Sequence, residues 1–156
     1  MTEPLGIRRL RRTLVIHRIV QVALIALLLY MALLFQERFQ QKYASLKPFY
    51  TSLVLTVLVQ VGLFFPIRKF AGTEARRELN AAARETMSGE EQKQLRSQRL
   101  LADFIKASVF IFFVAFILML KEQATVFQST AFFCCIGTVL SYLQNFNHAI
   151  RGQLGN

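Results

Sequence analysis

Acidic residues are scarce in this sequence, and none of them lies within its longest apolar stretches. The 156 residues include 19 Lys+Arg but only 9 Asp+Glu, and Asp103 is the single aspartate. General acid–base catalysis by carboxylates needs acids at close spacing, and proton or cation pathways usually contain an acid within the membrane. The sequence also lacks a glycine-rich phosphate loop, a G-x-S-x-G elbow and an H-E-x-x-H motif. We therefore expect a non-enzymatic protein without catalytic residues.

Cysteine is also rare, and tryptophan is missing altogether. Cys134 and Cys135 are adjacent in the middle of an apolar stretch. Metal sites use spaced ligands, and disulfide frameworks use cysteines that can close loops. The adjacent pair therefore indicates two small apolar side chains, and we expect no metal site.

Hydrophobic residues, by contrast, make up 54% of the chain, against roughly 45–50% in soluble domains. They form blocks that are about as long as a membrane-spanning helix. Because lipid forces each backbone hydrogen bond to close within its own segment, each block predicts a transmembrane helix. The sequence thus predicts an all-α integral membrane protein with a single membrane domain over residues 1–156. Its expected spans are residues 14–35, 49–67, 104–120 and 124–146, with a polar connector over residues 68–102.

The connector carries signals for two short helices. Pro66 predicts that the second span ends or kinks nearby, and Thr73 can cap a new helix that runs to about Met87. Ser88 and Glu91 form a capping box for a helix that passes into the third span. We therefore predict four transmembrane helices as two antiparallel hairpins, joined by a short cytoplasmic helical hairpin.

Some connector residues are apolar at helical spacing. They can pack against the helix that returns to the third span, or they can dock on a partner. We favour the first interpretation because short helices need tertiary packing. These residues are Leu79, Ala82, Ala83 and Met87.

The positions of the basic residues predict the orientation. Fifteen of the 19 lie in the N-terminal region, in the connector, or at Lys106 and Arg151, and four lie in the other loops. Because basic loops stay in the cytoplasm, both termini and the connector are expected there. Compact loops and the lack of an organelle-targeting segment indicate a bacterial inner membrane. The residues expected at lipid head groups, as topology anchors, are Arg8, Arg9, Arg11, Arg12, Arg18, Arg68, Lys69 and Lys106.

The N-terminal arginines also admit other interpretations. A cleaved secretory signal would need a small-residue cleavage site after a short apolar core, which the sequence does not provide. A twin-arginine export signal fits poorly with three further spans. A basic arm for nucleic acid remains open as an alternative, but juxtamembrane arginines ordinarily set orientation, so we expect no nucleic-acid partner.

Polar residues within the spans recur at helical spacing. They predict either hydrogen bonds between packed helices or a polar path for a solute, and we favour packing because no acid lines the path. The predicted stripe consists of Gln21, Ser52, Thr56, Gln60, Cys134, Thr138, Ser141 and Asn145. The opposite face of the fourth span is expected to meet lipid through Phe132, Phe133, Ile136, Val139, Leu140 and Leu143.

The two histidines raise a redox alternative. His17 and His148 are expected at the same end of the first and fourth spans, where two imidazoles on facing helices can ligate a haem b iron. Interfacial histidines need no ligand, so we expect no cofactor, and haem stays the speculative exception.

Together these patterns favour an accessory, assembly or scaffolding subunit that binds the lipid bilayer and other membrane proteins or copies of itself. A small homo-oligomeric transporter or channel is the alternative, and a haem-bearing electron carrier comes third. In its layout alone, with a basic start, two hairpins and a charged inner connector, the chain resembles the small accessory proteins of the ATP synthase protein I family.

Overall fold

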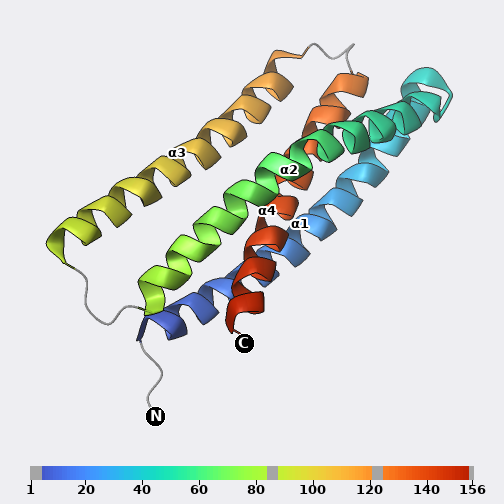
Figure 1. Cartoon of the computed structure of the whole chain (residues 1–156). Coiled ribbons are helices and arrows are strands. Elements are labelled where there is room, and N and C mark those ends of the chain that lie inside the picture. The colour runs from blue at the N-terminus through green and yellow to red at the C-terminus, as the bar shows by residue number, and fades with distance from the viewer. Residues whose placement is uncertain (1–4, 84–87, 121–124, 155–156) are drawn as a thin grey trace.

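The computed structural model describes residues 5–83, 88–120 and 125–154, and these residues form long helices (Figure 1). At 1.5 Å per residue, helices of 30 to 39 residues are about 45 to 58 Å long. All four are long and apolar enough to cross a membrane, as predicted. Each also extends beyond a hydrocarbon layer of about 30 Å. The helices are α1 (Leu5–Tyr43), α2 (Lys47–Ala83), α3 (Gly89–Met119) and α4 (Thr125–Leu154).

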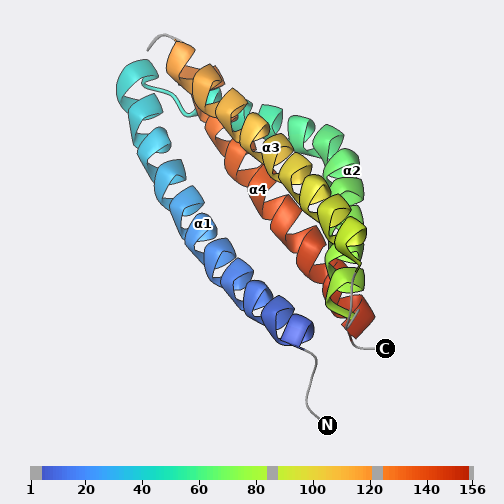
Figure 2. The same cartoon turned by 90° about the vertical axis from the view of Figure 1, so that its left-hand side faces the viewer.

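The fourth helix is the centre of the bundle. Consecutive helices run in opposite directions (Figure 1), and α4 contacts each of the other three, most extensively α2 (Figure 2). In its most apolar stretch 39% of the residues are buried, against 6% for each of the other helices. The central position of α4 corrects one prediction: Phe133, Ile136 and Leu143 are buried and do not meet lipid.

The second helix does not end at Pro66, although an end or a kink was predicted there. It runs unbroken to Ala83, so Thr73 is not a cap, and its hydroxyl donates to the Lys69 carbonyl one turn back (2.9 Å). A proline removes one intrahelical hydrogen bond. Beyond the proline, Ala71 and Ala75 are buried against α1 and α4, so tertiary packing supports this part of the helix.

The start of the third helix agrees with prediction. The Ser88 hydroxyl accepts from the Glu91 amide (3.3 Å), and the Glu91 carboxylate accepts from the Ser88 amide (3.1 Å). From this capping box α3 runs unbroken to Met119. The predicted linker between the third and fourth spans, residues 121–123, lies outside the described residues, as does Met87.

Two apolar clusters hold α1, α2 and α4 together, one near each end of the bundle. The first consists of Leu10, Leu14, Ala71, Ala75, Phe146 and Ile150. Leu79 and Ala82 pack against this cluster of α1, α2 and α4, whereas we predicted that they pack against the helix that returns to the third span. The second consists of Phe35, Phe39, Phe49 and Phe133. It lies next to the turn where Ala44, with a φ of 48°, ends α1.

Candidate functional site

One residue of the predicted stripe, Gln60, reaches from α2 to α4 with its side chain. The side-chain amide of Gln60 donates to the Cys134 carbonyl (2.9 Å) and to the Thr138 hydroxyl (3.3 Å). Gly137 makes room for it, because a Cβ there would lie 3.0 Å from both Cδ and Nε2 of Gln60. The amide therefore fills a notch in α4 that a glycine leaves open.

The other α2 stripe residues satisfy their hydroxyl groups locally. Ser52 is fully buried and donates to the Phe49 carbonyl (3.0 Å), while Thr56 donates to the Ser52 carbonyl (2.8 Å). The same Ser52 carbonyl accepts a longer bond (3.4 Å) from the hydroxyl of Thr130 on α4. On α4, the Asn145 amide donates to the Ser141 carbonyl (2.8 Å) of its own helix. These groups support close helix packing.

The remaining stripe residue, Gln21, belongs to a network between α1 and α4. Its side-chain oxygen accepts from the Asn147 amide (3.3 Å), and Oδ1 of Asn147 lies 3.1 Å from Nδ1 of His17. Asn147 is buried, yet it is not among the residues of the predicted stripe. Its position next to His148 in a polar run was the available signal.

The structure places the two histidines differently. His17 meets Asn147 and the edge of the Phe146 ring, with a centroid separation of 5.2 Å, whereas His148 is exposed. The contacts of His17 are those of a hydrogen-bonded packing residue. This placement therefore adds no support to the hypothesis of a haem between them.

We expect Asn147→Leu to lower the free energy of unfolding by about 1 kcal/mol, because it removes both interhelical contacts of this network. Unfolding in mixed detergent micelles measures the change. Gln144→Leu, at an exposed position one turn away, is the matched control. An equal effect of the two substitutions would show that the network contributes no stability.

A group of charged residues that sequence reasoning missed joins three helices around Glu74. This residue is buried, with 8% of its surface exposed. Its carboxylate accepts from Lys106 on α3 (2.9 Å) and from the Tyr142 hydroxyl on α4 (2.7 Å). Lys106 also lies 2.8 Å from Asp103 and 5.5 Å from the centroid of the Tyr142 ring. Lys106, which we had placed at lipid head groups, is therefore engaged within the protein.

Two further contacts join α2 to α3 nearby. The Arg99 guanidinium donates to both oxygens of Glu78, at 2.8 and 2.5 Å. Arg77 reaches across to the Gln98 carbonyl (3.0 Å). We call this group the charged clasp: Glu74, Arg77 and Glu78 of α2, Gln98, Arg99 and Lys106 of α3, and Tyr142 of α4.

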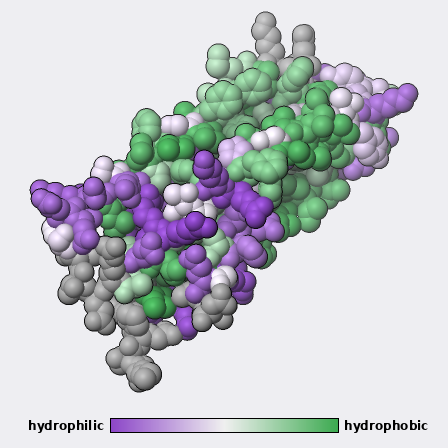
Figure 3. Space-filling model, in the orientation of Figure 1, coloured by the Kyte–Doolittle hydropathy of each residue, from purple (hydrophilic) through white to green (hydrophobic). Residues whose placement is uncertain are grey.

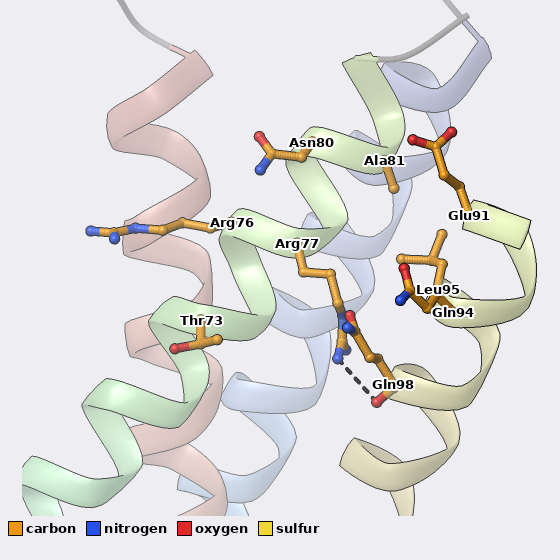
Figure 4. A pocket seen from close by; sticks show the side chains of 9 residues that line it. All are labelled: Thr73, Arg76, Arg77, Asn80, Ala81, Glu91, Gln94, Leu95 and Gln98. Carbon is orange, nitrogen blue, oxygen red and sulfur yellow. Dashed lines mark hydrogen bonds between the residues drawn. The ribbon is translucent and has the colours of Figure 1, made fainter. Parts of the chain in front are cut away.

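A polar cleft of about 490 Å³ lies beside the clasp, between the end of α2 and the start of α3. In Figure 4 the side chain of Arg77 points toward Gln98, whereas Arg76 points away from α3. Nε and Nη2 of Arg77 are buried without a hydrogen-bond partner, but they lie 3.9 and 3.7 Å from the carboxylates of Glu78 and Glu74. The guanidinium thus lies close to both carboxylates of the clasp.

Most of the other predicted head-group residues are exposed at the same end of the molecule. Hydrophilic surface gathers around the starts of α1 and α3, while apolar surface covers the middle (Figure 3). Leu10 and Leu14 are buried, so they dock the start of α1 on the core with the arginines facing outward. The exposed residues are Arg8, Arg11, Arg12, Arg18, Arg68 and Lys69, and the Arg9 side chain lies outside the described part.

Neither metal ligation nor a known family gives this arrangement a function. Within the described ranges, no group of three or more His, Cys, Asp or Glu residues is placed to hold a metal ion. No family model, curated protein or solved structure matches the chain.

Proposed function

We propose that this chain is a four-span protein of a bacterial inner membrane, with both termini in the cytoplasm. In this proposal it is a non-enzymatic accessory, assembly or scaffolding subunit of a larger membrane complex. Support for the membrane assignment comes from the four long apolar helices. Support for the orientation comes from the basic residues exposed in the first half of α1 and the second half of α2, since such residues are retained in the cytoplasm.

One observation carries the accessory function: the amide side chains of the predicted stripe are hydrogen-bonded within the bundle. Gln60 bonds to α4, Gln21 bonds to Asn147, and Asn145 bonds to its own helix. A conducting path would need such groups free to coordinate a solute. The outward faces of α1, α2 and α3 instead offer large apolar side chains, such as Phe65 and Phe112. These faces suit lipid and the transmembrane helices of partners.

Purification from native membranes in mild detergent tests this proposal. We expect one or a few membrane proteins to accompany the tagged chain in near-stoichiometric amounts. A photo-crosslinker at Phe112, which is 63% exposed on α3, should capture the same proteins. The same crosslinker at buried Phe133 is the matched control and should capture none.

Two results would contradict the accessory function. The first is a chain that leaves the membrane alone, as a monomer, under conditions that keep other complexes intact. The second is solute flux into proteoliposomes that Gln60→Leu or Asn145→Leu abolishes, since that result would establish the transporter alternative.

A further inference from the structure

The third helix is joined to the rest of the bundle mainly at one end. Its polar links run from Gln98 to Lys106, a length of about 12 Å along the helix. Among the described residues, no hydrogen bond or ion pair joins residues 107–119 to another helix. The tethers of α3 are therefore confined to the charged clasp.

The membrane-crossing part of α3 is loosely packed. Ala102, which lies within the clasp segment, is the one buried residue among the described residues of this helix. Beyond Lys106 most of the large side chains are exposed, as at Ile111 (63%) and Leu118 (78%). In Figure 1 the ribbon of α3 runs apart from that of α2. This half of the helix rests on its neighbours without being enclosed by them.

Loose packing has a specific consequence in a bilayer. Lipid chains are as apolar as leucine, so there is no hydrophobic gain when an apolar helix leaves lipid for protein. Close packing and polar contacts must supply the free energy of docking. The α2–α4 pair has both, through the Gln60 notch and the close approach at Ser52. Along α3 the polar contacts lie in the clasp.

We propose that α3 is a movable arm that the charged clasp holds against α2 and α4. The clasp acts as a conformational device: when Glu74 no longer bonds to Lys106 and Tyr142, the membrane-crossing half of α3 separates from the α1–α2–α4 core. That core keeps its own apolar clusters and polar bonds, none of which includes a residue of α3. The inference holds whether or not the chain serves as an accessory subunit.

Distances between spin labels in lipid nanodiscs test the proposal. One label pair joins Tyr50 on α2 to Leu118 on α3, and the reference pair joins Tyr50 to Phe127 on α4. All three positions are exposed, and Cys134 and Cys135 are replaced by alanine. We expect Glu74→Gln to shift most of the α2–α3 distance distribution to longer, broader values and to leave the α2–α4 distribution unchanged.

Two controls separate the clasp from general loosening. Glu37→Gln removes an exposed acid on α1 and should leave both distributions unchanged. Glu78→Arg should lengthen the α2–α3 distance, and Arg99→Glu in the same chain should shorten it again by restoring an ion pair of reversed sign. Unchanged α2–α3 distances in Glu74→Gln overturn the proposal. Broadening of both label pairs also overturns it, because Glu74 would then support the whole bundle.

Discussion

Replacement of Gly137 by leucine is expected to lower the free energy of unfolding by about 3 kcal/mol. A Cβ at this position would lie 3.0 Å from two atoms of the Gln60 side chain, and the rest of a leucine needs the same space. The Gln60 amide must then leave its notch and lose its bonds to the Cys134 carbonyl and the Thr138 hydroxyl. Unfolding of the purified protein in mixed micelles measures the loss.

The chain offers a matched control and an internal test of the cause. A Cβ at Gly62 of α2 would meet nothing within 4 Å, so Gly62→Leu should not destabilise the protein. If the clash with Gln60 is responsible, Gly137→Leu should cost less than half as much in a Gln60→Ala background, because the displaced side chain is gone. Equal costs in the two backgrounds would rule out this explanation.

The sequence predicted the face of α2 from which Gln60 meets Thr138 of α4, but not which helix lies at the centre. Ser52, Thr56 and Gln60 follow one another at intervals of four, and this spacing places them on one helix face wherever the helix lies. The bulky face of α4 was assigned to lipid because lipid and protein interior are both apolar. Hydropathy therefore cannot distinguish a lipid-facing phenylalanine from buried Phe133.

The charged clasp could not be predicted from local patterns for a different reason. Pro66 and Thr73 together predicted a break in α2, which placed Glu74 in the first turn of a short helix. In the unbroken helix Glu74 lies well away from either end, and its side chain bonds to α3 and α4. Its partner Lys106 lies 32 residues further along the chain. A lysine near the end of a span also has an ordinary interpretation, with its amine at the head groups. Only the tertiary arrangement shows that it turns inward.

Lys106→Met is expected to lower the free energy of unfolding by about 2 kcal/mol. Methionine keeps much of the length and apolar surface of lysine but leaves the Glu74 carboxylate buried without its nearest cation. Removal of one partner from a fully buried ion pair costs about 3–5 kcal/mol. The Lys106 side chain is 35% exposed, so water screens part of this interaction and the expected cost is smaller. Unfolding in mixed micelles provides the measurement, with exposed Lys69→Met as the matched control.

A second substitution distinguishes a stranded charge from lost packing. If Lys106→Met destabilises the protein because it leaves Glu74 charged and buried, then adding Glu74→Gln should recover part of the loss. The glutamine amide carries no charge and can still accept the Tyr142 hydroxyl, which now donates to Glu74 over 2.7 Å. The double variant should therefore be more stable than Lys106→Met alone. If the double variant is less stable than Lys106→Met alone, a neutral residue at position 74 does not restore stability. The aliphatic stem of Lys106, and not its charge, then holds α3 in place.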